Sequence, residues 1–143
     1  MVFRDCIPIT MCLLDVWHKT RISKEVMISI GENKHPLCHF VSESGEPWIN
    51  VRSDLVSDEG LHLYDSLAMA SVFKPEMLTF EDAHVRVETQ GRYTSGETVC
   101  EFNESIFGKV LNLKPNTKVA LALDVDNFNQ LFNERVVDYL KTL

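Results

Sequence analysis

The feature that most constrains how this chain can fold is an apolar run at residues 67–73, which begins shortly after an acidic residue, Asp65. A helix formed by this run would have no polar face, so it must be buried inside a domain. Lys74 and Pro75 follow the run, and a helix usually ends before a proline because the preceding residue is pushed out of helical geometry. The sequence therefore predicts a buried helix with a carboxylate at its start.

Two interpretations of Asp65 are open at this point. The carboxylate can cap the helix by accepting hydrogen bonds from the N–H groups of the first turn. It can instead offer oxygen to a metal ion or a sugar hydroxyl in a cleft above the helix. Capping is the more common arrangement, so the local residues favour it, and the rest of the chain has to decide between the two.

Composition excludes several classes of protein. The chain has 143 residues and 45% hydrophobic content, which is enough for one domain with a real core. Its formal net charge is -7 and it has no Lys/Arg cluster, so nucleic acid is not an expected partner. No apolar run approaches the roughly 20 residues of a membrane helix, and no secretory signal is visible. We therefore expect no membrane partner and a cytoplasmic location.

The cysteines point to a reducing compartment rather than to a disulfide framework. None of them forms a C-x-x-C pair, so we expect reduced and mostly buried thiols at Cys6, Cys12, Cys38 and Cys100. His35, Cys38 and His39 have a spacing that would suit zinc on a helix. No second Cys/His cluster completes four ligands, so a zinc module is discounted.

The first half of the chain predicts a strand that leads to candidate site residues. Residues 6–14 are an apolar run of strand length, in which Pro8 restricts the first half to an edge or entry segment. Asp15 and His18 follow this run, at the end of the strand that carries ligands in open α/β sheets. A turn with a capping Asp and a surface His is the more common arrangement there.

Two short helices and a long loop are predicted next. Residues 23–31 read as a helix with Ser23 as its N-cap, and Pro36 opens a second short helix at residues 35–40. The polar segment 42–60 predicts a long loop or flap, which can include a helical turn at residues 48–51. Trp48 on this loop either stacks on a flat ligand or anchors the loop to the core, and anchoring is the more common case.

The second half of the chain predicts a hairpin, a strand and a helix. Residues 83–90 alternate strictly between apolar and polar side chains, and residues 97–102 form the antiparallel partner strand. Residues 119–125 predict a strand buried on both faces. Asp126 or Asn127 is predicted to cap a final helix. The apolar stripe of that helix consists of Phe128, Leu131, Phe132, Val136, Tyr139, Leu140 and Leu143.

Three segments, in this order, resemble segments of the calcium-dependent nucleoside hydrolases. Residues 14–19 (L-D-V-W-H-K) are similar to the family's L-D-V-T-H segment, with Trp17 in place of the usual Thr. Residues 64–68 (Y-D-S-L-A) are similar to its H-D-P-x-A segment. Residues 87–99 (V-E-T-Q-G-R-Y-T-S-G-E-T-V) are similar to its V-E-T-x-G-x-x-T-R-G-x-T-V segment, with Ser95 for Arg. The resemblance covers nearly the whole chain.

The resemblance implies an α/β fold and a hydrolytic activity. The expected architecture is the C-terminal part of an open mixed sheet flanked by helices, with an antiparallel hairpin and a C-terminal helix, in a single partial domain over residues 1–143. The implied reaction cleaves the N-glycosidic bond of purine or pyrimidine ribonucleosides to base and ribose, with calcium as cofactor. The family's D-x-D-x-x-x-D-D cluster supplies most calcium ligands, and this sequence lacks it. The chain also begins after the family's ribose-holding E-x-N segment, so we expect it to be inactive alone.

The resemblance assigns roles to two neighbouring residues. Asp65 corresponds to a metal ligand, so in the complete family fold the calcium interpretation of its carboxylate outweighs the cap. One carboxylate cannot make a site of about six to eight oxygens, so this chain alone is not expected to retain calcium. Tyr64 stands where many family members place a His that protonates the leaving base and others place an aromatic residue that stacks on purines. A phenol is a weak acid at neutral pH, so proton donation, base contact and simple packing all stay open for Tyr64, and so does the base preference.

A non-catalytic function is the alternative. The chain is then a truncated paralogue or isoform that acts as a binding or assembly subunit rather than taking a small ribonucleoside as substrate. The strands predicted at residues 7–14 and 119–125 suit burial on both faces, and their neighbours are expected in the absent half of the fold. We therefore expect a homo-oligomer or association through the exposed sheet.

Overall fold

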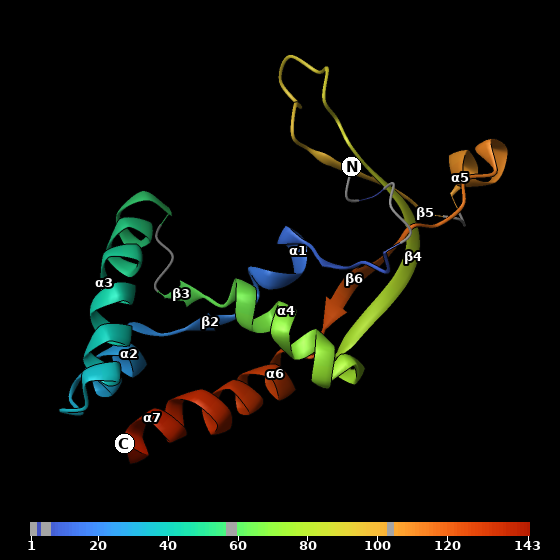
Figure 1. Cartoon of the computed structure of the whole chain (residues 1–143). Coiled ribbons are helices and arrows are strands. Elements are labelled where there is room, and N and C mark those ends of the chain that lie inside the picture. The colour runs from blue at the N-terminus through green and yellow to red at the C-terminus, as the bar shows by residue number, and fades with distance from the viewer. Residues whose placement is uncertain (1–2, 4–6, 57–59, 103–104) are drawn as a thin grey trace. The chain divides into compact units, whose positions relative to one another are not determined.

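The computed structural model describes residue 3 and residues 7–56, 60–102 and 105–143 (Figure 1). The expected α/β class is confirmed, with an open four-stranded sheet, an antiparallel hairpin and a C-terminal helix. The chain divides into two compact units, and each unit is made from two separate stretches. Unit 1 comprises Met1–Leu13 and Leu78–Ala122, and unit 2 comprises Leu14–Met77 and Leu123–Leu143.

Unit 1 is built on the four-stranded sheet, whose strand order is β1-β6-β4-β5. Strand β1 (Thr10–Cys12) pairs in parallel with β6 (Thr117–Leu123), and β4 (Leu78–Val87) pairs antiparallel with β5 (Thr98–Phe102). The short helix α5 (Ile106–Leu111) follows β5. The core of the unit consists of Ala83, Val85 and Val119, with Phe3, Met11, Leu13, Cys100 and Phe102 packed against them.

The strand predicted at residues 6–14 is much shorter than expected. Strand β1 covers only Thr10–Cys12, and residue 6 lies outside the described residues. Pro8 has no N–H for a sheet ladder, and the first bond to β6 is made by the Ile9 carbonyl, which accepts from Lys118 N at 2.9 Å. The prediction that residues 119–125 are buried on both faces is correct only at the first two residues. Val119 and Ala120, on opposite faces of β6, are buried, but Leu121 is exposed and the strand ends at Leu123.

The longest segment that resembles the nucleoside hydrolases forms the connection of the predicted hairpin, which is confirmed (Figure 1). The Glu88 carboxylate accepts from Gln90 N at 2.6 Å and from Gly91 N at 3.0 Å. Gly96 has a φ of 95°, in the left-handed region that favours glycine, and its N–H donates to Glu88 O at 2.7 Å. These residues fix the shape of a turn, so the segment has a structural role in the hairpin.

The hairpin connection should loosen at low pH. The N–H groups of Gln90 and Gly91 lower the pKa of the Glu88 carboxyl below its ordinary value. Because the folded-state pKa is lowered, the stabilisation is present at neutral pH and is lost as the pH falls below the unfolded value of about 4.3 and through the folded one. Amide chemical shifts of Gln90 and Gly91 should report a titration below that of an ordinary glutamate.

The control for this titration is Glu88→Gln, which keeps an acceptor oxygen but carries no titrating group. The two amide shifts should stay flat with pH in this variant. Wild-type shifts that titrate like a glutamate in an unstructured peptide would contradict the role of Glu88 in the turn.

Unit 2 is mainly helical. Its elements are α1 (Leu14–Trp17), β2 (Arg21–Ile22), α2 (Lys24–Gly31), α3 (Pro36–Val56), β3 (Leu61–His62), α4 (Tyr64–Phe73), a 3-10 turn (Pro75–Met77), α6 (Val125–Phe132), a π-helical turn (Asn133–Val137) and α7 (Asp138–Thr142). Strands β2 and β3 pair antiparallel.

The predicted N-cap of α2 is confirmed, since the Ser23 hydroxyl accepts from Val26 N at 3.4 Å. No helix in the described residues is long and apolar enough to cross a membrane.

The predicted loop at residues 42–60 is wrong, because α3 continues through it to Val56. Cys38, Gly45 and Ile49 are buried at helical spacing and form a stripe along this helix. A Cβ added at Gly45 would lie 2.4 Å from Met27 Cε, so the glycine allows α2 and α3 to pack closely (Figure 1). This packing outweighs the hydrogen bond lost at Pro47. Trp48 is 65% exposed and does not anchor a loop.

The helix predicted at residues 67–73 is confirmed, but its burial on every side is wrong. In α4, Leu67 and Ala70 are buried, while Val72 is 77% exposed and Phe73 is also exposed. The helix ends as predicted at Lys74, whose N–H donates to Ala70 O at 2.8 Å. Only one stripe of α4 therefore lies in the core of unit 2.

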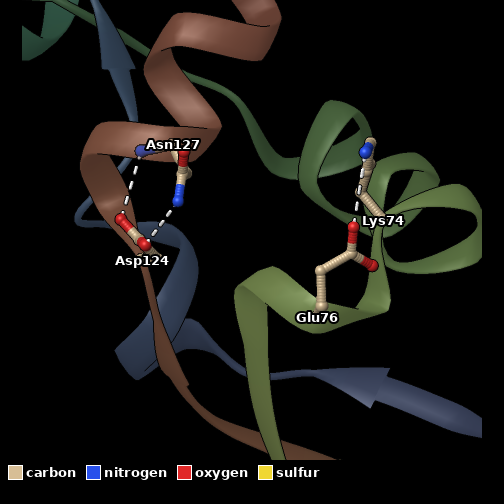
Figure 2. A network of polar contacts seen from close by, with 4 residues as sticks. All are labelled: Lys74, Glu76, Asp124 and Asn127. Carbon is tan, nitrogen blue, oxygen red and sulfur yellow. Dashed lines mark hydrogen bonds and ion pairs between the residues drawn. The ribbon is translucent and has the colours of Figure 1, made fainter.

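The cap of the last helix is Asp124, not Asp126 or Asn127 as predicted. Its carboxylate accepts from Asn127 N at 3.1 Å and from the Asn127 side chain at 2.7 Å (Figure 2). The predicted stripe is correct at Phe128 and Leu140, which are buried. Between them lies the π-helical turn, which has more residues per turn than an α-helix and so shifts the buried face. Val137 is therefore buried in place of the predicted Val136.

Candidate functional site

The two predicted site residues open helix α4. Tyr64 and Asp65 are its first and second residues, and both are exposed. The N-cap position belongs to Leu63, which makes no side-chain capping bond. Asp65 is therefore in the first turn rather than at the cap, where a negative charge is favoured by the helix dipole. Its carboxylate faces a groove instead of closing the helix end.

That groove has a volume of about 330 Å³ and lies in unit 2 between α4 and the C-terminal helices. Its lining is mostly apolar and includes Met69, Phe73 and Phe132. Asp65 and Arg135 contribute charged groups to the same groove. The arrangement offers one carboxylate beside an apolar surface that could accept a flat or apolar group.

Tyr64 belongs to a set of aromatic rings that we call the Trp17 cluster, consisting of Trp17, His62 and Tyr64. The Trp17 ring centroid lies 4.0 Å from that of Tyr64 and 5.3 Å from that of His62, both in edge-to-face geometry. His62 is buried, and its Nδ1 lies 2.9 Å from Thr20 O. Because a carbonyl oxygen only accepts, His62 Nδ1 carries the proton in this bond.

The other residues singled out after the first strand lie on the surface. Asp15 is exposed in the first turn of α1. His18 is also exposed, with Nδ1 2.9 Å from Leu14 O and its ring centroid 6.2 Å from that of Trp17. Trp17 and Tyr64 each lie in a segment that the sequence analysis singled out. Nothing in the sequence indicates the contact between them, because they are far apart along the chain.

The three possible zinc ligands are engaged in structural contacts or lie apart on the helix. The Cys38 thiol is buried and donates to Leu140 O at 3.2 Å. His35 Nδ1 accepts from Leu37 N at 3.3 Å at the start of α3. His39 is exposed. Within the described ranges, no group of three or more His, Cys, Asp or Glu side chains could hold a metal ion.

The lack of such a group among the described residues also bears on whether they could bind calcium. Calcium takes about six to eight oxygen ligands, several of them carboxylates. Asp65 offers a single carboxylate, and the described residues group no others with it. They therefore fit one ligand position of a calcium site and do not form a complete one.

The comparison with protein families agrees with the resemblance of the motifs. The family described as inosine-uridine preferring nucleoside hydrolase matches residues 1–130. The non-specific ribonucleoside hydrolase RihC of Salmonella typhimurium is 35% identical over 130 residues, which are 91% of this chain and 39% of that protein. RihC of Salmonella paratyphi B matches with the same values. The chain thus spans about two fifths of the length of these curated relatives.

Solved structures agree in fold. A purine-preferring ribonucleoside hydrolase from Gardnerella vaginalis superposes with a TM-score of 0.82 at 22% identity, covering 99% of this chain and 43% of that one. A plant nucleoside hydrolase superposes with a TM-score of 0.80 at 18% identity, covering 95% of this chain and 43% of that one. At these identities the superpositions describe the fold of the chain.

Proposed function

This chain belongs to the inosine-uridine preferring nucleoside hydrolase family, and from that membership we propose that it supplies part of a site that hydrolyses the N-glycosidic bond of ribonucleosides. The observation that carries the proposal is the position of Asp65. Its carboxylate is exposed, lies in the first turn of α4 and is not used as the helix cap. It occupies the place of the metal-binding Asp in the segment that resembles the family.

Asp65 is proposed as one calcium ligand, with the remaining oxygens supplied from outside the described residues. When bound, calcium lowers the pKa of a coordinated water and orients the ribose hydroxyls. The role of this chain is to hold the Asp65 carboxylate still. Leu67 and Ala70 provide that rigidity, because they fix α4 in the core of unit 2 only two and five residues further along the helix.

Tyr64 is proposed as a contact for the leaving base. The residue is 40% exposed, so part of its surface is open to a ligand. Its hydroxyl is a weak acid at neutral pH, which favours base contact over proton donation. His62, the nearest histidine in sequence, is buried with Nδ1 bonded to Thr20 O, and this placement supports a structural rather than an acid role for it.

Alone, the chain is expected to release no ribose from inosine or uridine, even in excess calcium. One carboxylate cannot assemble a site of about six to eight oxygens around the ion. A reducing-sugar assay on the purified chain measures this directly. Turnover that follows the protein through purification and disappears in Asp65→Ala would contradict the expectation.

A chimera gives the positive test of the proposed function. The chain replaces the matched 130-residue segment of the Salmonella typhimurium relative, and the rest of that enzyme stays as it is. A folded chimera that releases ribose from inosine supports the proposal. A chimera that folds, as judged by its melting curve, and binds calcium but has no activity would contradict it.

A non-catalytic role in binding or assembly is the second candidate. The observation that favours it is the exposed apolar face of α5, formed by Ile106, Phe107 and Val110. Sedimentation separates a compact monomer from an associated chain. Association that is lost when these residues become polar, together with an inactive chimera, would favour this function.

A further inference from the structure

Two departures from the family segments coincide in space. Trp17 stands where the resembling segment has Thr, and Tyr64 stands where many members have His. The two rings lie 4.0 Å apart between centroids, with an angle of 83° between their planes. Substitutions that are distant in sequence but touch in the fold are expected to act together.

Trp17 is held from two directions. The Thr20 hydroxyl donates to Trp17 O at 2.7 Å, and Thr20 N donates to the same oxygen at 2.9 Å. Thr20 O in turn lies 2.9 Å from His62 Nδ1, and the His62 ring lies 5.3 Å from the Trp17 ring. Thr20 and His62 are both buried. Backbone and ring of Trp17 are thus fixed by a closed chain of contacts.

Tyr64 receives its support from this arrangement. It is the first residue of α4 and lies partly in solvent, where a tyrosine ring samples several rotamers. The centroid of the Trp17 ring lies 4.0 Å from that of Tyr64 and the centroid of the His62 ring 6.0 Å, and these neighbours restrict the rotamers of a residue that stays 40% exposed. A threonine at position 17 is too short to make this contact.

We propose that Trp17 is a positioning residue that holds the Tyr64 ring ready to contact a flat nucleobase. The inference rests on the proposed function, because it deepens the role given there to Tyr64. The inference adds Trp17, a residue outside the proposed metal site. It predicts that substitutions at positions 17 and 64 have non-additive effects on nucleoside affinity. A fixed ring loses less conformational freedom when a base binds, so the coupling should appear in nucleoside affinity.

The test is a double-mutant cycle on the full chain, read by calorimetric titration with inosine. Tyr64→Ala and Trp17→Thr are each expected to weaken inosine binding by about 2- to 10-fold, the range of an aromatic pair. The double variant should be no weaker than Tyr64→Ala alone. Trp17→Phe keeps a ring edge and should retain most of the affinity. Titration with ribose, which has no base, should show no difference between the unsubstituted chain and these four variants.

Fluorescence provides a direct readout at the ring. The chain has two tryptophans, so Trp48→Phe leaves Trp17 as the single reporter, and Trp48 is exposed on α3. Inosine should quench Trp17 emission saturably in this background, and Tyr64→Ala should remove most of that quenching. Absence of inosine binding, additive effects in the cycle, or quenching that survives Tyr64→Ala would overturn the proposal. These outcomes are separate from ribose release by the chimera, which tests the proposed function.

Discussion

Asp65→Asn in the chimera is expected to lower ribose release from inosine and calcium affinity by orders of magnitude. The substitution keeps the shape of the side chain but removes a full negative charge from the proposed ligand position. Asp65 is exposed and is not the N-cap of α4, so the melting temperature without calcium should change little. Calorimetric calcium titration and the ribose assay measure the two effects.

The chain offers a closely matched control in Asp126→Asn. Asp126 is the second residue of α6, as Asp65 is of α4, and both are exposed acidic residues in a first helical turn. The control removes the same charge from the same helical position, and calcium affinity and turnover should be unchanged. Equal calcium affinity in Asp65→Asn and the unsubstituted chimera would remove Asp65 from the metal site.

Phe128→Ala is expected to lower the free energy of unfolding by about 3–5 kcal/mol. Phe128 is 1% exposed, lines the groove beside Asp65 and has its ring centroid 6.4 Å from that of Phe132. Truncation removes a large buried ring and leaves a cavity between α4 and α6, which pack against each other. Urea unfolding followed by far-UV circular dichroism measures the loss.

Phe107→Ala is the control for this loss of an aromatic ring. Phe107 is 68% exposed on α5, so the same substitution should change the free energy of unfolding by about 0.5 kcal/mol or less. A comparable destabilisation in both variants would contradict the assignment of Phe128 to the core of unit 2.

The sequence predicted correctly those elements that are specified by residues close together in the chain, such as helix caps and alternating strands. Ser23 caps α2 because its hydroxyl reaches the first turn, and alternation along β4 is visible in the residues themselves. The continuation of α3 was missed because Gly45 and Pro47 both disfavour helix, and only packing against α2 compensates for them. The shift from Val136 to Val137 was missed because a π-helical turn leaves no mark in the apolar spacing.

The candidate site was predicted in part for a similar reason. Tyr64 and Asp65 are adjacent in the sequence and lie in one recognisable segment, so their position at the start of a helix could be expected. The contact of Tyr64 with Trp17 depends on how α1 and α4 are placed in unit 2. No sequence pattern links these two residues, so their contact could be found only from the structure.

The interleaving of the two units bears on how the chain responds to proteolysis. The chain passes between them after Leu13, after Met77 and after Ala122, so neither unit is one continuous segment. A single cut in the hairpin connection at residues 91–96 would give two fragments that each carry part of both units. The paired strands β4 and β5 would lie on opposite sides of the cut and hold the fragments together. A nicked chain should therefore migrate as one species under native conditions and as two only after denaturation.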